Sequence, residues 1–149
     1  KDYTQPGNDY VTTANLVSVT GSVALKDATP ICDNNYSSAY DSNATVMPEE
    51  FVFRFDKAIE TETTLRIVAN YASKQGPSKV ELYVQRGAEE WVQIKNCSLN
   101  WDTTIDDGQC VEIPLKTTGI TGLKLVVTAA NLTWNHYIIS ELDLFDSAK

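Results

Sequence analysis

Apolar residues recur at every second position along three stretches of the chain. In the first stretch, Phe51, Phe53 and Phe55 alternate with Val52 and Arg54. The same spacing places Val80, Leu82 and Val84 on one side of a second stretch, and Leu123, Leu125 and Val127 on one side of a third. Because successive side chains of a β-strand point to opposite faces, each stretch can turn one apolar face toward a core. The pattern therefore predicts three strands, each with one buried face.

Shorter segments rich in β-branched and aromatic residues predict further strands. They are Leu16–Val19, Ser22–Leu25, Leu65–Ala69, Trp91–Lys95, Val111–Leu115 and Ile138–Phe145. Turn residues separate the strands, as in Gln75-Gly76-Pro77, Arg86-Gly87, Asp107-Gly108 and Thr118-Gly119. One short helical turn is predicted at Ser37–Tyr40, and no longer amphipathic helix is indicated. Many strands joined by short turns predict an all-β sandwich or barrel.

The length and composition of the chain favour one globular domain. The chain has 149 residues, of which 42% are hydrophobic, so it can bury a core of ordinary size. We interpret residues 1–12 as a polar N-terminal linker segment and residues 13–149 as a single domain. The chain then resembles a module of a longer protein, to which other domains would be tethered.

The charge balance excludes some classes of partner. Twenty acidic residues outnumber twelve basic ones, which gives a formal net charge of −8. Nucleic acids and anionic lipid surfaces attract clustered Lys and Arg, and the sequence has no such cluster. It also has no apolar run near 18 residues, so membrane insertion is not expected. Neutral ligands and divalent cations fit this composition better.

The sequence offers little for catalysis. His136 is the only histidine, and there is no Gly-x-Ser-x-Gly motif, so neither a nucleophilic triad nor a zinc site is indicated. The three cysteines are Cys32, Cys97 and Cys110. Cys97 and Cys110 are close enough in sequence to form a disulfide across a hairpin-like loop, and three reduced thiols are the alternative. We therefore expect a protein that binds a ligand without transforming it.

The order of several segments resembles the discoidin, or coagulation factor V/VIII type C, domain. The segments are YSSAYDSNAT (Tyr36–Thr45), FVFRF (Phe51–Phe55), LRIVANYAS (Leu65–Ser73), KVELYVQRGAEEWVQI (Lys79–Ile94), LKLVVTAAN (Leu123–Asn131) and ISELDLF (Ile139–Phe145). This superfamily is also called galactose-binding-like and includes the family 32 carbohydrate-binding modules. The resemblance covers about residues 16–145. It implies an eight-stranded antiparallel jelly-roll β-sandwich with ligand-binding loops at one end.

The sequence departs from the family pattern at positions that concern the ligand. Galactose-binding members commonly carry an Arg in the loop after the Leu65–Ala69 strand, where this chain has Asn70–Gln75. Lys124 stands near the place of an Arg that is frequent in the penultimate strand. The resemblance therefore implies the fold more firmly than it implies galactose.

The resemblance also implies a structural calcium ion near the ligand-binding loops. The matching positions are Asp41, Asn43 and Thr45, together with Glu141 from the last strand. Calcium takes six to eight oxygen ligands from carboxylates, carbonyls and hydroxyls, which these residues can supply. The alternative is a polar turn capped by Asp41, with Glu141 at the surface.

Aromatic residues in loops are candidates for ligand binding, because an aromatic ring can pack against the C–H face of a sugar while polar side chains bind its hydroxyls. The loop before the last strand is the richest, with Asn131, Trp134, Asn135 and His136. A second loop offers Asn70, Tyr71, Lys74 and Gln75, and single candidates elsewhere are Tyr36 and Trp101, the latter in a polar loop where we expect it to be exposed. The alternative is that Trp134 and Tyr137 close one end of the sandwich. Trp91 is interpreted as a core residue.

The favoured hypothesis is a carbohydrate-binding module that adheres to a glycan or glycoconjugate. It would belong to a larger bacterial protein that is secreted or displayed on the cell surface, in the periplasm or outside the cell. A protein-interaction or cell-adhesion domain on the same fold is the alternative, and a flat apolar patch would favour it. A lipid-headgroup binder ranks last, because the candidate loops are polar and the chain is acidic.

Overall fold

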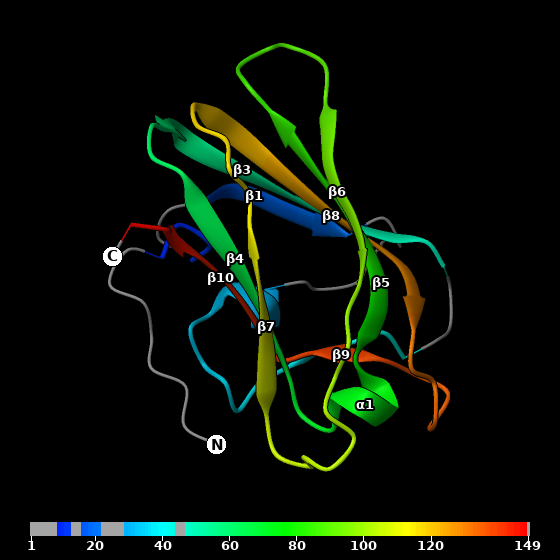
Figure 1. Ribbon diagram of the computed structural model, residues 1–149. Coiled ribbons are helices and arrows are strands. Elements are labelled where there is room, and N and C mark those ends of the chain that lie inside the picture. The colour runs from blue at the N-terminus through cyan, green and yellow to red at the C-terminus, as the bar shows by residue number, and fades with distance from the viewer. Residues whose placement is uncertain (1–8, 13–15, 22–28, 44–46, 149) are drawn as a thin grey trace.

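Two antiparallel sheets dominate the computed structural model, which describes residues 9–12, 16–21, 29–43 and 47–148 (Figure 1). The five-stranded sheet has the order β1 (Leu16–Gly21), β3 (Glu49–Ile59), β8 (Ile120–Ala130), β5 (Pro77–Gln85) and β6 (Val92–Ser98). The three-stranded sheet has the order β10 (Glu141–Asp146), β4 (Thr63–Ala69) and β7 (Gln109–Pro114). The eight strands of these two sheets confirm the predicted all-β antiparallel sandwich.

The core lies between the two sheets and is built from the alternating positions that predicted the strands. The register aligns Phe51 with Leu125 and Phe53 with Leu123, so the apolar faces of β3 and β8 are continuous. All nine apolar residues of the three predicted alternating sets are buried. The facing sheet contributes Leu65, Ile67, Ile113, Leu142 and Leu144. Burial of each such large side chain stabilises the fold by about 1.5–3 kcal/mol, so the alternation largely fixes which faces meet.

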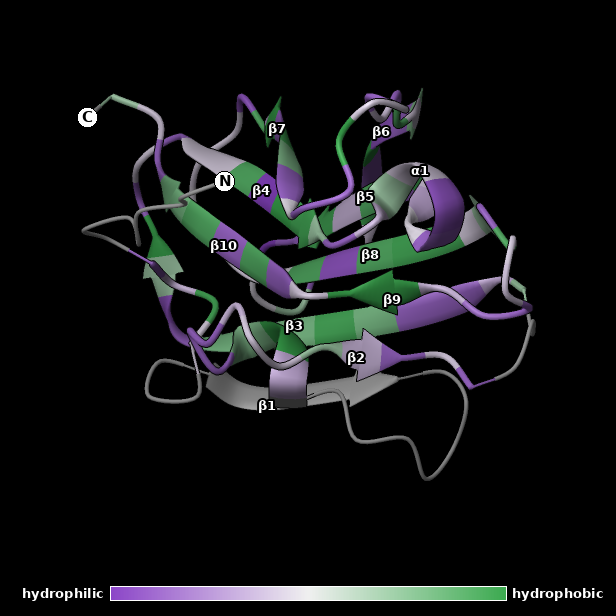
Figure 2. Cartoon of the chain, turned by 90° about the horizontal axis from the view of Figure 1, so that it is seen from below, coloured by the Kyte–Doolittle hydropathy of each residue, from purple (hydrophilic) through white to green (hydrophobic). Residues whose placement is uncertain are grey.

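A short third sheet covers one end of the sandwich. It pairs β2 (Tyr40–Asp41) with β9 (Ile138–Ile139), and the helical turn α1 (Ala72–Gln75) lies at the same end (Figure 2). The predicted strand Ile138–Phe145 is therefore divided. It breaks at Ser140, whose N–H donates to the carbonyl of Val68 at 2.8 Å, and its two halves join different sheets.

The helical turns lie elsewhere than predicted. The prediction of a helical turn at Ser37–Tyr40 is wrong, because Tyr40 begins β2. The helical turns of the described residues are η1 (Thr29–Cys32) and α1. The predicted strand Ser22–Leu25 lies outside the described residues. Within the part of the chain that the structure describes, no helix has both the length and the apolar character needed to span a membrane.

The N-terminal segment belongs in part to the folded domain. Asp9, Val11 and Thr12 are buried, and the N–H of Tyr10 donates to the carbonyl of Leu144 at 2.8 Å. The linker assignment therefore does not hold for residues 9–12. The sequence signal here is weak, because only two apolar residues of 9–12, Tyr10 and Val11, pack against the core.

Trp91 lies elsewhere than predicted, whereas the cysteines agree with one of the two alternatives. Trp91 is half-buried on the outer face of the five-stranded sheet, where a Cβ on Gly122 would lie only 2.9 Å from its ring. The ring thus packs on the sheet from outside and not in the core. Cys97 and Cys110 form no disulfide in the structure, which supports the second of the two cysteine alternatives.

Candidate functional site

Two loops that the sequence analysis treated separately lie together at the end of the sandwich that holds α1 and β9 (Figure 2). The 70–76 loop joins β4 to β5 and contains α1, and the 131–137 loop joins β8 to β9. Most of the predicted ligand-binding residues lie on these two loops. The structure therefore unites the two richest candidate segments in one surface.

Hydrogen bonds tie the two loops to each other. The N–H of Asn131 donates to the carbonyl of Gly76 at 2.9 Å, and the N–H of Thr133 donates to the carbonyl of Lys74 at 3.1 Å. The side-chain amide of Asn131 donates to the carbonyl of Ala72 at 3.0 Å. Asn131 therefore acts as a brace between the loops, and its amide is occupied within the protein.

Exposed hydrophobic side chains concentrate on this surface. The described residues include four large exposed hydrophobic side chains, and three of them are Tyr71, Leu132 and Trp134, with exposed fractions of 43%, 37% and 48%. The fourth is Val92, on β6. Single exposed apolar residues are ordinary, whereas several gathered on adjoining loops are typical of binding surfaces.

The two aromatic rings form a corner. The ring centroids of Tyr71 and Trp134 lie 5.7 Å apart with an interplanar angle of 71°, an edge-to-face arrangement. Tyr71 has a left-handed backbone conformation, with φ 50° and ψ 42°, immediately before α1. This conformation is uncommon for a residue with a large side chain and is concentrated at functional sites. Its N–H donates to the carbonyl of Asp106 at 3.0 Å, which holds the turn in place.

Polar groups surround the corner. The Lys74 ammonium lies 5.9 Å from the centroid of the Trp134 ring and 3.9 Å from the Asp106 carboxylate. Asn70 and Asn135 are exposed and lie on the same two loops as the rings. Asn135 also has a left-handed backbone conformation, with φ 64°. Gln75 differs from the prediction, because it is buried and its amide donates to the carbonyl of Asn70 at 2.9 Å. It supports the loop and is not available to a ligand.

The exit of the 131–137 loop is anchored to β2. His136 Nδ1 lies 2.8 Å from Asp41 Oδ1. The N–H of Ser42 donates to the carbonyl of Tyr137, and the N–H of Tyr137 donates to the Ser42 hydroxyl, both at 2.9 Å. Tyr137 is fully buried, whereas Trp134 is half exposed. The alternative in which both side chains close the end of the sandwich therefore holds for Tyr137 only.

A buried carboxylate that the sequence analysis missed lies beneath this anchor. Glu49 is fully buried and accepts hydrogen bonds from the hydroxyls of Tyr137 and Tyr40, the latter at 2.6 Å. The pKa of each hydroxyl is raised above its ordinary value, mainly by burial and secondly by the hydrogen bond to Glu49. The burial of Glu49 could have been predicted from the alternating pattern, because Glu49 is in phase with Phe51 and Phe53 and so points inward.

Two other predicted ligand residues lie away from the corner. The expectation that Trp101 is exposed is wrong, since its ring is buried and its indole N–H donates to the carbonyl of Pro77 at 2.7 Å. Tyr36 is half-buried, and its hydroxyl donates to Asp143 of β10 at 2.8 Å. Both residues therefore have structural partners in place of a ligand.

The two carboxylates of the calcium-ligand set that the resemblance implied, Asp41 and Glu141, have different neighbours in the structure. Asp41 Oδ1 accepts the N–H of Asn43 at 2.8 Å and is also hydrogen-bonded to His136. This oxygen therefore helps to anchor the 131–137 loop. Thr45 lies outside the described residues. Glu141 is fully buried on β10 and not at the surface, and its neighbours are different acidic residues.

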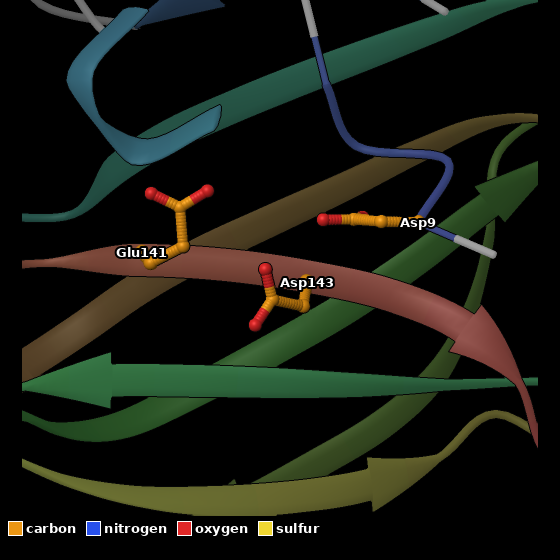
Figure 3. A group of neighbouring side chains, drawn as sticks. All are labelled: Asp9, Glu141 and Asp143. Atoms are coloured by element: carbon orange, nitrogen blue, oxygen red, sulfur yellow. The ribbon is translucent and has the colours of Figure 1, made fainter. Parts of the chain in front are cut away.

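Those neighbours are Asp143 on the same strand and Asp9 from the N-terminal segment (Figure 3). One oxygen from each of the three carboxyl groups lies within 4.8 Å of the others. Burial raises the pKa of Asp9 to about 7 and that of Glu141 to about 9. Since all three groups are buried, the cluster is costly to keep charged without a counter-ion.

No protein-family model matches the sequence, and no curated protein sequence matches it. Solved structures do match in fold. The Clostridium perfringens module CpGH89CBM32-5, solved in complex with GalNAc-β-1,3-galactose, shares 18% identity over 91% of this chain and 98% of its own, with a TM-score of 0.69. Chitosan-binding module 1 from the chitosanase/glucanase of Paenibacillus sp. IK-5 shares 17% identity over 93% of this chain and 98% of its own, with a TM-score of 0.64.

A third similar structure holds two family 32 modules beside the M60 catalytic domains of ZmpB from Clostridium perfringens. It shares 18% identity over 92% of this chain, with a TM-score of 0.68, and this chain spans 15% of its length. At such identities the similarity establishes the fold. The chain has the discoidin-like, galactose-binding-like β-sandwich fold of the family 32 carbohydrate-binding modules.

Proposed function

We propose that this chain is a non-catalytic carbohydrate-binding module whose ligand site is the corner between the 70–76 and 131–137 loops. The observation that carries the proposal is the gathering of exposed Tyr71, Leu132 and Trp134 on these adjoining loops. The ring faces would pack against the C–H face of a sugar. The polar groups available to its hydroxyls are those of Asn70, Lys74, Asn135 and His136.

The angle between the rings supports a small ligand. Tyr71 and Trp134 meet at 71° and therefore present two walls in place of one flat platform. One sugar unit can lie between two such walls, whereas an extended flat chain needs rings in one plane. The site would thus bind a terminal or branching sugar, with few contacts to the rest of the glycan.

The rigidity of the loops supports binding with modest polar contacts. The backbone bonds of Asn131 and Thr133 to the 70–76 loop, and of Tyr137 to Ser42, fix the loop at both ends. A loop held in its binding conformation loses little entropy when the ligand arrives. Weak affinity for one sugar unit then remains useful, because tethering raises the local concentration of an attached domain near the glycan.

The similar structures support the setting of the proposal. One of them binds GalNAc-β-1,3-galactose, one is a chitosan-binding module, and one includes catalytic domains in the same chain. By the same design, this module would be tethered to other domains of a bacterial protein that is secreted or displayed on the surface. Because the loop Arg common in galactose-binding relatives is missing, both galactose-type and amino-sugar ligands should be tested.

The test is a glycan array probed with the full chain, followed by titration calorimetry with GalNAc-β-1,3-galactose and with chitosan oligosaccharides. Tyr71→Ala should abolish binding of the glycan that scores, whereas Val92→Ala, which removes an exposed apolar residue from β6, should not. A silent array would contradict the proposal. A silent array together with Tyr71-dependent capture of a protein would support the interaction-domain alternative.

A further inference from the structure

We propose that Glu49 is a positioning residue, which holds the 131–137 loop where Trp134 meets Tyr71 and thereby sets the affinity of the corner for its glycan. This inference rests on the function proposed above and adds to it a residue that the ligand does not touch. Glu49 is fully buried at the start of β3, and each of its two carboxylate oxygens accepts a hydrogen bond from a tyrosine hydroxyl.

The first argument is that Glu49 itself is fixed. Its backbone pairs with Val127 of β8, so it belongs to the five-stranded sheet. Two positions further along β3, Phe51 packs edge-to-face on Tyr40, with the ring centroids 4.9 Å apart. A side chain that leaves a close-packed sheet in such surroundings has little freedom to move. Glu49 therefore offers a fixed point to the groups that bond to it.

The second argument is the small size of the sheet that Glu49 holds. The described ladder between β2 and β9 consists of two residue pairs. Two strands of this length are not stable by themselves in water, so the place of the third sheet depends on its attachments to the larger sheets. Glu49 Oε2 accepts the Tyr40 hydroxyl of β2 at 2.6 Å, and Glu49 Oε1 accepts the hydroxyl of Tyr137, which directly precedes β9. One carboxylate thus joins both strands to the five-stranded sheet.

The third argument is the use of a buried carboxylate at all. Tyr40 and Tyr137 are buried, and their ring centroids lie 6.3 Å apart. Replacing a buried charged group by apolar side chains of similar volume is often neutral or stabilising, so stability alone does not require Glu49. Apolar contacts tolerate sliding, whereas two hydroxyls and one carboxylate meet in a narrow range of distances and angles. The carboxylate therefore gives the third sheet a defined position.

The fourth argument is the short path from Tyr137 to the corner. Tyr137 exchanges two hydrogen bonds of 2.9 Å with Ser42, which hold its backbone beside the end of β2. Trp134 lies three residues earlier in the same loop, whereas Tyr71 is held separately by the carbonyl of Asp106. The two rings lie 5.7 Å apart, so a shift of about 1 Å in one of them changes the shape of the corner. A displaced Tyr137 would therefore move one wall of the site and leave the other in place.

Glu49→Gln in the full chain tests the inference. The amide keeps the size of the side chain but has one acceptor oxygen in place of two, so one tyrosine hydroxyl loses its acceptor. We expect the Kd for the glycan that scores on the array to rise about threefold to tenfold, within the range for residues that act through a neighbour. Glu81→Gln is the matched control, because Glu81 of β5 also accepts a tyrosine hydroxyl at 2.6 Å, from Tyr83. It should leave the glycan affinity unchanged.

A second measurement needs no glycan. Amide hydrogen exchange of Thr133 and Tyr137 reports on the loop, because both N–H groups donate hydrogen bonds that hold it. In Glu49→Gln both amides should exchange about tenfold faster, since the loop opens more often once the hydroxyl bond is weakened. The N–H of Gly119, which is hydrogen-bonded at the opposite end of β8, is the internal reference and should not change.

Val84→Ala separates positioning from a general loss of stability. Val84 is fully buried in the half of β5 that is remote from the 70–76 loop, so its truncation should lower the melting temperature from a place outside the third sheet. This variant should keep the glycan affinity of the unaltered chain. Should Glu49→Gln fail to fold, as judged by circular dichroism, Tyr137→Phe removes the same bond from the side of the loop and carries the same expectations.

Unchanged glycan affinity in folded Glu49→Gln would overturn the inference, and so would an equal loss of affinity in Val84→Ala. Unchanged exchange at Thr133 and Tyr137 would do the same, because the loop would then not depend on Glu49. A silent glycan array together with faster exchange at these two amides has a different meaning. It would contradict the proposed function and still support the positioning of the loop by Glu49.

Discussion

Trp101 and Trp134 occupy similar sequence surroundings and have opposite fates. Both follow a strand, both lie in loops rich in Asn and Thr, and both were considered as ligand-binding residues. In the structure, the exposed fraction of Trp101 is 8% and that of Trp134 is 48%. Composition alone therefore does not decide whether a loop tryptophan meets solvent or the core.

What separates them is the phase of the preceding strand. After β6 the alternation continues, with Leu99 buried, Asn100 exposed and Trp101 buried again, although the strand itself has ended. In the 131–137 loop, the residues from Leu132 to Asn135 are exposed one after another, because backbone bonds to the 70–76 loop replace the strand pairing. Trp101 keeps the phase of the strand and is buried, whereas Trp134 follows a break in phase and is exposed.

The largest expected effect is on stability at Trp101. Trp101→Ala should lower the free energy of unfolding by about 3–5 kcal/mol, the usual cost of truncating a buried Trp. It should also leave the Pro77 carbonyl without the indole donor. Urea denaturation measures the loss. A change under about 1 kcal/mol would mean that Trp101 is not a packing residue, and the contrast with Trp134 would fail.

Trp134→Ala should behave in the opposite way. Its side chain is half exposed, so the free energy of unfolding should change by no more than about 0.5 kcal/mol. Glycan affinity should fall by about 2 kcal/mol, or about thirtyfold in Kd, as expected for an aromatic anchor of a binding site. Titration calorimetry with the glycan that scores on the array checks this. Unchanged affinity combined with lost stability would place Trp134 among the structural residues.

The fold was the part most accessible from the sequence. Alternation at Phe51–Phe55 and its two counterparts reports the direction of side chains directly, so both the strands and the core face could be predicted. The division of Ile138–Phe145 at Ser140 could not, because it depends on which sheet each half meets. The packing of residues 9–12 likewise depends on β10, which is more than 130 residues away in sequence.

The site was predicted in its parts and not in its arrangement. Trp134 and Tyr71 were both predicted as candidates, because aromatic residues in polar loops are visible in a sequence, although their exposure is not. That the two rings touch was not predicted, since it requires the hydrogen bonds between separate loops. Gln75 and Asn131 looked like ligand-binding amides, but a polar side chain is equally able to satisfy a backbone carbonyl, and only the structure distinguishes the two uses.

Asn131 tests whether the bonds between the loops keep Trp134 in position. Asn131→Ala removes the bond to the Ala72 carbonyl, which still accepts the N–H of Gly76, so we expect a loss of about 1 kcal/mol in stability. Glycan affinity should fall by a smaller factor than in Trp134→Ala, because the ring remains but is held less firmly. Asn100→Ala, at an exposed position beside Trp101, is the control and should change neither quantity.

The smallest effect is expected at Lys74, whose ammonium lies over the Trp134 ring and near Asp106. Both partners of this ion pair are largely exposed, and such pairs contribute little because solvent screens them. Lys74→Gln should therefore change stability by less than about 0.5 kcal/mol and affinity for a neutral glycan by less than about 1 kcal/mol. Calorimetry at low and high salt separates the charge from the ring. If Lys74→Gln lowered the glycan affinity as much as Trp134→Ala does, and if this difference disappeared at high salt, the charge of Lys74 would be the main contributor to binding. In that case neither tryptophan would anchor the ligand, and Trp134 would differ from Trp101 in its exposure alone.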